Sequence, residues 1–420
     1  MYRVTRLANG LTVATAEMPH LASVSLGLWV AVGGRFEPAA LNGASHFIEH
    51  MLFKGTRRRD AGQISQAVEG IGGHLNAFTT EEYTCFYAKA THDHLPELLD
   101  VLGDMFLNST FAPGELRKER DVIKEELDSY LDQPHQLVEE LLSETLFPDH
   151  PLGRSLTGTR KSLDRLDRRK LLAFRRENYV APAMLITVAG RCRHEQVLRA
   201  VRPLAARLPA GARPVYSPFA GAQERPRVRL LTRNTAQLQL ALGFRVCSRH
   251  DPRRYPLRVL NALLGENMSS RLFQILREDR GLAYSVHSGV VYFDDVGTLT
   301  ISAGLDPHQL RPALKLIRTE LRRLRLRPPG AAELRRARDF IIGQFELGLE
   351  GSENRMTWIG EQLLAHGRIM PAVEIKQLLH AVTPAAITAV ARECFQPDRA
   401  CLAIVSPLKS ARGLEPLLCP

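Results

Sequence analysis

Residues Asn42–Thr56 read NGASHFIEHMLFKGT, with two histidines and a glutamate set among apolar residues. The leading NGAS offers helix N-cap residues and the closing KGT a stop, so we expect about two turns of helix over His46–Phe53. On such a helix His46 and His50 are an i,i+4 pair, and Glu49 lies on the same face. Two imidazoles at that spacing can share one Zn²⁺, and a neighbouring carboxylate can polarise its water. The alternative is a solvent-facing helix that carries these residues without a metal.

A catalytic zinc usually takes three protein ligands, so the third must come from another segment. The helical stretch Glu119–Leu127, ERDVIKEEL, follows a Pro-Gly turn. Glu119 and Glu126 are seven residues apart and share a face beside apolar positions, whereas Glu125 points about 100° away. A carboxylate set beside apolar side chains needs a cation. An ordinary solvated helix face is the alternative here.

Length and composition indicate a globular protein of two domains. The chain has 420 residues, of which 45% are hydrophobic and 24% charged, enough for two domains of about 150–200 residues each. No apolar window reaches the roughly 18 residues that span a bilayer, and the N-terminus lacks the apolar core of a secretory signal. We therefore expect no transmembrane segment and a cytoplasmic location. Six scattered cysteines without a CxxC pair predict reduced thiols.

The net charge of +11 raises the possibility of nucleic-acid binding, because phosphate contacts need such charge. The basic runs, however, carry Leu at helical spacing and few aromatic residues. Solvated helix faces explain them better, and we expect no nucleic-acid partner.

The two halves of the chain resemble each other. Residues 91–123 and 305–341 both follow the order strand, turn, helix, Pro-Gly turn, helix, and Arg338 lies 218 residues after Arg120. The Pro-, Gly- and Ala-rich stretch between them is a natural linker. We predict an α+β fold of two homologous domains, each a mostly antiparallel sheet packed with helices. The expected boundaries are 1–211 for the first domain, 212–225 for the linker and 226–420 for the second domain.

The repeat also serves as a control for the acidic residues. At the same offset Glu119 becomes Ala337 and Glu126 becomes Gln344, while the Arg-Asp pair and the apolar positions persist. The helix does not need those carboxylates for folding. This favours a site confined to the first half of the chain.

The sequence resembles the pitrilysin, or insulinase-like, zinc metallopeptidases, which carry the inverted HxxEH motif. It looks closest to the bacterial relatives of the mitochondrial processing peptidase. The resemblance covers His46–Thr56, Gly72–Thr79, Glu119–Glu126 and, in the second half, Ser270–Ser285. It therefore spans nearly the whole chain.

The resemblance implies roles for residues that pattern alone leaves open. It implies that Glu126, 76 residues after His50, is the third ligand of one Zn²⁺ per chain, and that Glu119 orients the ligands. It implies that Leu75, Asn76, Ala77 and Phe78 bind the substrate as a strand added to a sheet edge. Taken without the resemblance, this segment is a plain edge strand.

The resemblance further implies that Arg277 and Tyr284 hold the substrate backbone and stabilise the developing oxyanion. Without it, a surface-helix arginine and a core strand aromatic would be the better interpretation. The expected reaction is hydrolysis of extended or unfolded peptides, with Glu49 as general base towards water activated by zinc.

The family's chamber needs four such domains, so this chain would form half of it and pair as a homodimer, or as a heterodimer with a related subunit. The rival hypothesis is a catalytically silent scaffold subunit. The retained His46, Glu49, His50 and Glu126 argue against it.

Overall fold

The structure is a computed structural model and describes residues 2–418. Two compact units make up the chain, and neither is contiguous in sequence. The first unit comprises the described residues up to Asp128 together with Arg154–Ser217 and Glu346–Ile369, and the second comprises Ser129–Gly153, Pro218–Phe345 and the described residues from Met370 onward.

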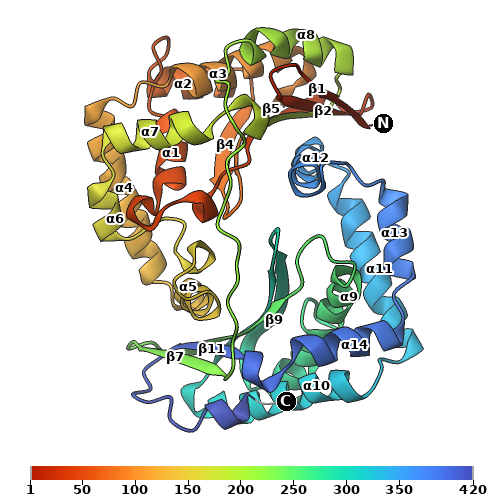
Figure 1. Ribbon diagram of the computed structural model, residues 1–420. Coiled ribbons are helices and arrows are strands. Elements are labelled where there is room, and N and C mark those ends of the chain that lie inside the picture. Colours follow the sequence, from red (N-terminus) through yellow and green to blue (C-terminus); the bar gives the residue numbers. More distant parts are fainter. Residues whose placement is uncertain (1, 419–420) are drawn as a thin grey trace. The chain divides into compact units, whose positions relative to one another are not determined.

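The first unit is built on a six-stranded sheet in the order β1-β2-β6-β3-β5-β4 (Figure 1). β2 and β6 pair in parallel and the other neighbours are antiparallel. Its strands are β1 (Tyr2–Arg6), β2 (Thr12–Glu17), β3 (Ser23–Val30), β4 (His74–Thr79), β5 (Thr84–Thr91) and β6 (Met184–Gly190). Its helices are α1 (Ala44–Leu52), α2 (Ala61–Glu69), α3 (Leu95–Asn108), α4 (Pro113–Leu131, which runs on past the unit's boundary), α6 (Arg160–Arg165), α7 (Arg168–Asn178), α8 (His194–Ala205) and α12 (Ser352–His366).

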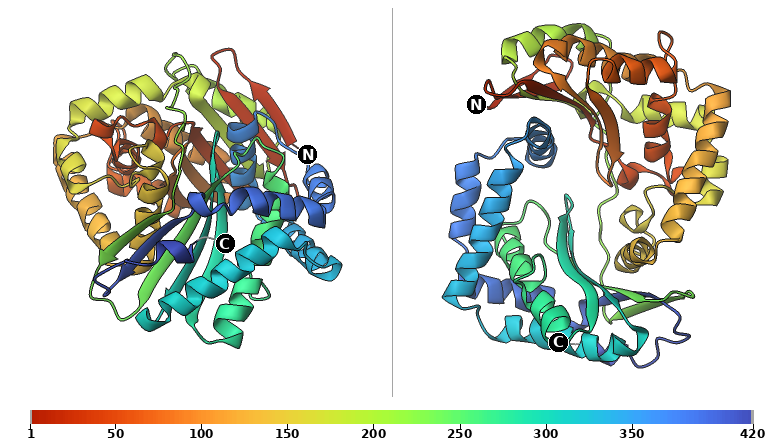
Figure 2. Two further views of the ribbon diagram at one scale, coloured as in Figure 1. Left: turned by 60° about the horizontal axis from the view of Figure 1, so that its bottom comes forward. Right: turned by 180° about the vertical axis from the view of Figure 1, so that it is seen from behind.

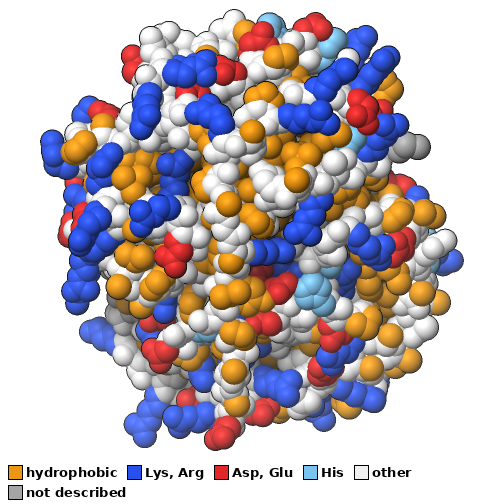
Figure 3. Space-filling model, turned by 45° about the horizontal axis from the view of Figure 1, so that its top comes forward, with side chains coloured by type: hydrophobic (Ala, Val, Ile, Leu, Met, Phe, Trp, Pro, Cys, Tyr) orange, Lys and Arg blue, Asp and Glu red, His pale blue; other side chains and the backbone are white. Residues whose placement is uncertain are grey.

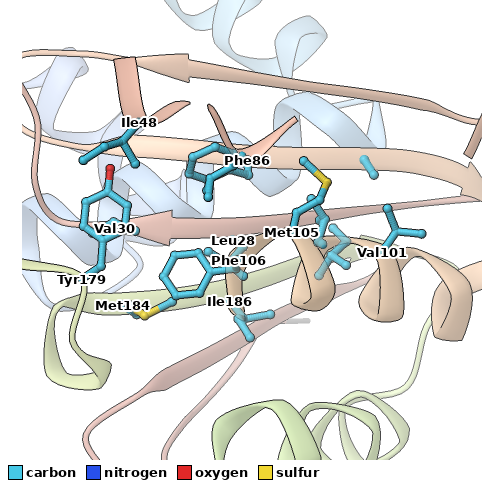
Figure 4. Packing of buried hydrophobic residues seen from close by; sticks show 14 of the residues in the cluster. Leu28, Val30, Ile48, Phe86, Val101, Met105, Phe106, Tyr179, Met184 and Ile186 are labelled. Atoms are coloured by element: carbon cyan, nitrogen blue, oxygen red, sulfur yellow. The ribbon is translucent and has the colours of Figure 1, made fainter. Parts of the chain in front are cut away.

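Both faces of this sheet are covered, because successive residues of a strand point to opposite sides. On β3, alternate residues from Val24 to Val30 pack into the main core with helices α1, α2, α3, α7 and α8. Figure 4 shows part of this core, in which the rings of Phe106 and Tyr179 stack at 5.8 Å. On the other face Trp29 packs against α12 and donates a hydrogen bond from Nε1 to Thr187 Oγ1 at 2.8 Å.

The second unit has a five-stranded sheet in the order β7-β11-β8-β10-β9. β7 and β11 pair in parallel and the rest are antiparallel. Its strands are β7 (Arg227–Thr232), β8 (Leu238–Val246), β9 (Ala283–Tyr292), β10 (Gly297–Leu305) and β11 (Cys401–Ser406). Its helices are α5 (Pro134–Leu146), α9 (Arg254–Leu264), a π-helix over Phe273–Asp279, α10 (Leu310–Leu326), α11 (Ala331–Gly348, which also runs past the boundary), α13 (Ala372–His380) and α14 (Pro384–Cys394).

Helices α9, α10 and α14 share the main core of the second unit with alternate residues of β8 (Figures 1 and 2). The opposite face of the sheet, represented by Ala241, Ala403 and Val405, packs against α5. Each unit is thus a sheet with several helices on one face and a single helix on the other.

The two sheets share one topology once the extra edge strand β1 is set aside. β2-β6-β3-β5-β4 corresponds to β7-β11-β8-β10-β9, and α11 begins 218 residues after α4. The predicted α+β fold with two homologous, mostly antiparallel domains is confirmed. The predicted domain boundaries at 211 and 226 refer to the two homologous halves of the sequence. They remain a prediction, because the compact units are discontinuous and divide the chain differently. α5, which follows α4, packs in the second unit, and its counterpart α12, which follows α11, packs in the first.

Within the described residues no helix is both long and apolar enough to cross a bilayer. Five of the six cysteines are described and all are free thiols, while Cys419 lies outside the described residues. On the face drawn in Figure 3, basic side chains are spread among acidic and hydrophobic ones and do not form one stripe.

Candidate metal centre

Helix α1 places the motif's polar side chains on one face. It runs over Ala44–Leu52, close to the predicted His46–Phe53. Its apolar residues Phe47, Ile48, Met51 and Leu52 are buried in the core, which leaves His46, Glu49 and His50 half-buried on the opposite side. The packing of its apolar face anchors the helix, and this fixes the direction in which the face with His46, Glu49 and His50 points.

The start of α1 is held by a residue from outside the motif. The N-cap Gly43 has φ 92° and no side chain to cap the helix. The buried carboxylate of Glu37 instead accepts hydrogen bonds from the backbone N–H groups of Gly43 at 2.7 Å and Ser45 at 2.6 Å. An anion at this end also interacts favourably with the helix dipole. Burial is the larger influence on its acidity and raises the pKa of Glu37 to about 7.

Three side chains converge at the half-buried face of α1. Glu126, on α4, brings its Oε2 to 3.8 Å from His46 Nε2 and 3.6 Å from His50 Nε2. One donor atom from each of the three residues lies within 4.8 Å of the others. The structure thus joins the two histidines to Glu126, whereas Glu125 on the same helix is exposed.

This donor set fits zinc. Zinc bonds to histidine nitrogen and carboxylate oxygen are about 2.0–2.2 Å long, so tetrahedral ligands stand roughly 3.4 Å apart. The two nitrogen-to-oxygen distances given above are only slightly longer. Two imidazoles and one carboxylate are also ligands of catalytic rather than purely structural zinc sites, since they leave a fourth position open. Burial, and then the nearby His50, lower the pKa of His46 to about 4, so this imidazole is in the neutral form that binds metals.

The side chain of Glu119 contacts one of the two histidines. Its side chain is 5% exposed, and its Oε2 lies 3.1 Å from His50 Nδ1, which leaves Nε2 free to face Glu126. The second oxygen of Glu119 pairs with Lys54 Nζ at 2.8 Å. Within the described residues the Nδ1 of His46 is buried without a hydrogen-bond partner. The carboxylate therefore sets the tautomer of His50 but not of His46.

The carboxylate of Glu49 lies between α1 and the end of β4. Thr79, the last residue of β4, donates a hydrogen bond from Oγ1 to Glu49 Oε2 at 2.5 Å. Burial raises the pKa of Glu49, and the Thr79 hydrogen bond opposes that shift. The hydrogen bond also links the candidate base directly to the predicted substrate strand.

That strand lies at an edge of the sheet. β4 pairs with β5 in antiparallel register, from His74 opposite Lys89 to Thr79 opposite Thr84, and is the last strand in the order of the sheet. Leu75, Asn76, Ala77 and Phe78 all belong to it. The sequence interpretation as an edge strand is confirmed, and the role in binding peptide remains a prediction.

Arg277 and Tyr284 belong to the second unit and lie close together there. Arg277 is on the π-helix, and its Cζ lies 5.9 Å from the Tyr284 ring and 4.9 Å from the Phe273 ring. Tyr284, near the start of β9, is 76% exposed. It is thus an exposed side chain and not a core aromatic, which was the alternative interpretation.

Sequence reasoning missed Glu37, Lys54 and Thr79 as parts of this site. Glu37 lies six residues before Gly43, the N-cap residue of α1. Because this is outside the usual capping positions, no local sequence pattern marks Glu37 as a cap. Lys54 reads as part of a helix stop and Thr79 as the end of a strand.

Comparison with known proteins places the chain in a family. The sequence profile described as Insulinase (Peptidase family M16) matches residues 12–160, and that of the Peptidase M16 inactive domain matches residues 165–340. An uncharacterized zinc protease of Streptomyces coelicolor is 38% identical over 98% of this chain and 91% of its own length. One from Bacillus subtilis is 37% identical over 95% of this chain and 97% of its own length. The chain belongs to the M16 family of peptidases, as its sequence predicted.

Solved structures agree on the fold. A protease from Helicobacter pylori superimposes with a TM-score of 0.91 at 21% identity, covering 97% of this chain and 99% of that one. A Pseudomonas fluorescens protein described as a peptidase M16 inactive domain gives 0.90 at 20% identity, with the same coverage.

Proposed function

We propose that this chain is a zinc-dependent endopeptidase that hydrolyses extended or unfolded peptides. The observation that carries the proposal is the convergence of His46, His50 and Glu126, with Glu49 projecting from the same helix face. The relatives named zinc proteases support it, since they align over nearly the full length of both chains. Each chain would hold one zinc ion.

His46, His50 and Glu126 would hold the ion, and Glu119, against His50 Nδ1, would keep the Nε2 of His50 directed at it. Bound zinc would supply Lewis acidity and make water a usable nucleophile near neutral pH. Glu49 accepts the proton of the attacking water and then donates it to the leaving amine. The hydroxyl of Thr79 fixes the position of the Glu49 carboxylate for both transfers.

The free edge of β4 binds the substrate as an added strand. Main-chain hydrogen bonds then supply affinity with little demand on side chains, and folded surfaces are excluded because they offer no extended segment. Arg277 and Tyr284 hold the substrate backbone and stabilise the developing oxyanion. The functional assembly is a homodimer, in which two chains complete the chamber.

The proposal is tested with a quenched-fluorescent peptide and the purified full-length chain. Cleavage should disappear on dialysis against a strong zinc chelator and return on adding about one equivalent of zinc. Activity that survives exhaustive chelation would contradict the proposal. A metal-binding chain that cleaves none of a broad peptide library would favour the scaffold alternative.

Substrate binding by strand addition has its own test. Peptides methylated on alternate backbone nitrogens keep their side chains but lose main-chain donors. Methylation in one register should weaken binding by about tenfold or more, and methylation in the other should have little effect. Equal effects in both registers would argue against an added strand.

The role of Arg277 is tested against Arg280, an exposed arginine three residues further along the same segment. Arg277→Ala should lower kcat/KM with zinc content unchanged, whereas Arg280→Ala should stay near wild type. The same loss in both variants would indicate a general effect of charge on substrate attraction.

A further inference from the structure

The first unit contains a second candidate site that shares no residue with the metal centre. It is a cavity of about 730 Å³ lined by the end of α3, by α7 and by the segment that follows α8. That volume lies within the range of pockets that hold drug-sized ligands. Two kinds of side chain line it, arginines and large apolar groups.

Helix α7 supplies most of the cavity's charge. Its sequence, RRKLLAFRREN, puts Leu171 and Phe174 into the core. Four of its arginines line the cavity instead, and Arg207 adds a fifth: Arg168, Arg169, Arg175, Arg176 and Arg207. The packing of α7 against the core explains why one of its faces is apolar. It does not explain why the arginines cluster at the cavity.

None of these five arginines forms an ion pair with a carboxylate of the described chain. Arg168 donates to the backbone oxygen of Phe111 at 2.9 Å, and Arg207 donates to Asn108 Oδ1 at 3.0 Å. These acceptors are neutral. The side chains of Arg169 and Arg176 make no hydrogen bond to any residue that the structure describes.

Arg175 is the most buried of the group. It donates to the backbone oxygen of Phe106, and its Cζ lies 5.6 Å from the rings of both Phe106 and Phe111. Burial lowers the pKa of its guanidinium. Aromatic faces compensate a buried cation only in part, and a buried charge ordinarily has a charged partner. Contacts at or just after the end of α3 account for Arg168, Arg175 and Arg207, but not for Arg169 and Arg176.

The remainder of the lining is mostly apolar and includes Leu107 and Leu172. A second cavity of about 320 Å³ shares Leu107 and Arg207 with the first and adds Leu99 and Leu204. The two acidic residues that line this second cavity already pair with arginines outside the five, so they do not neutralise the first.

We propose that this arginine-rich cavity binds an amphipathic anion. Arg169, Arg176 and Arg207 hold its oxyanion headgroup, and its alkyl chain lies over Leu107 and Leu172 towards the second cavity. Guanidinium groups suit carboxylate and phosphate heads because they offer paired donors in a plane. A concave lining of a single sign also raises the local concentration of anions.

Calorimetric titration of the full-length chain tests the ligand class. Dodecyl phosphate, laurate, inorganic phosphate and dodecyltrimethylammonium are titrated below their micellar concentrations, with chelator present so that zinc has no part. The anionic amphiphiles should bind one per chain, at least about tenfold tighter than inorganic phosphate. The ratio of the affinities for dodecyl phosphate and laurate shows whether the cavity prefers a phosphate or a carboxylate headgroup. Failure of both to bind, equal affinity for inorganic phosphate, or equal affinity for the cationic amphiphile would overturn the proposal.

Variants on exposed positions locate the binding. Ala173 is exposed and lines the cavity, so Ala173→Glu places a carboxylate among the arginines, while Ala173→Gln adds similar bulk without charge. The first should weaken dodecyl phosphate binding at least about tenfold relative to the second. Equal affinities in the two would show that charge in this cavity plays no part.

A charge-matched pair gives an independent check. Arg169→Gln with Arg176→Gln should weaken binding about tenfold, whereas Lys161→Gln with Arg165→Gln, two exposed α6 cations outside the cavity, should change it less than about twofold. Melting temperatures confirm that each variant is folded. Similar losses in both pairs would reduce the effect to net charge and overturn the proposal.

Discussion

Replacing Glu119 by glutamine separates the orientation of a ligand from ligation itself. One carboxylate oxygen accepts from His50 Nδ1 at 3.1 Å and the other from Lys54 Nζ at 2.8 Å. Glutamine has nearly the same shape but only one acceptor, and it carries no charge. His50 therefore loses its charged partner, and its Nε2 becomes a weaker and less well oriented ligand for zinc. Losing such a partner typically lowers metal affinity by about 10- to 100-fold, or about 1.4–2.8 kcal/mol.

The assay is a competition titration of zinc against a chromophoric chelator near neutral pH. Glu125→Gln is the matched control, because it makes the same change of charge on the same helix at an exposed position beside Glu126. Lys54 is 31% exposed, so water can solvate its ammonium and global stability should change little. Equal zinc affinities for the two variants would refute the orienting role and reduce Glu119 to a structural partner of Lys54.

Three further results are expected. Glu126→Gln should lower zinc affinity by more than about 100-fold in the same titration, and near wild-type affinity would remove Glu126 from the ligand set. The pKa of Glu37 is raised to about 7, so the folded chain holds this proton more tightly than the unfolded chain. Wild type should therefore lose up to about 3 kcal/mol of unfolding free energy, relative to Glu37→Gln, as pH rises from about 4.5 through 7; parallel urea-denaturation curves would contradict this. A Cβ at Gly360 would lie 2.4 Å from the Trp29 ring, whereas one at Gly343 meets nothing within 4 Å. Gly360→Ala should cost about 1–3 kcal/mol and Gly343→Ala should be neutral or stabilising, as calorimetric melting will show.

Local periodicity was sufficient to predict the parts of the site that lie on single helices. The i,i+4 spacing of His46 and His50 fixes their shared face whatever packs around them, and the seven-residue spacing puts Glu119 and Glu126 on one side of α4. The repeat also predicted which elements correspond. The strands that end at Thr91 and Leu305 are β5 and β10, which hold equivalent places in the two sheets.

Features that depend on contacts between distant segments could not be predicted in this way. An amphipathic helix such as α5 or α12 fits any apolar sheet face, so its pattern does not say which of two similar sheets it will cover. Glu37 caps α1 across a loop, and Lys54 meets Glu119 only because α1 and α4 pack together. The Arg-Asp pair occurs in both halves of the chain, and in each half its arginine donates hydrogen bonds to the backbone of another segment. Arg120 donates to the backbone oxygens of Leu163, within α6, and Leu166, just after it. Arg338 donates to a backbone oxygen that follows α13.

Glu49→Gln separates metal binding from catalysis, because Glu49 is close to the ligands without being one of them. The variant is purified beside wild type, its zinc content is measured by elemental analysis, and cleavage of the quenched peptide is followed. We expect about one zinc per chain in both proteins and a loss of at least about 100-fold in kcat for the variant. Full activity in a zinc-loaded Glu49→Gln chain would contradict this expectation.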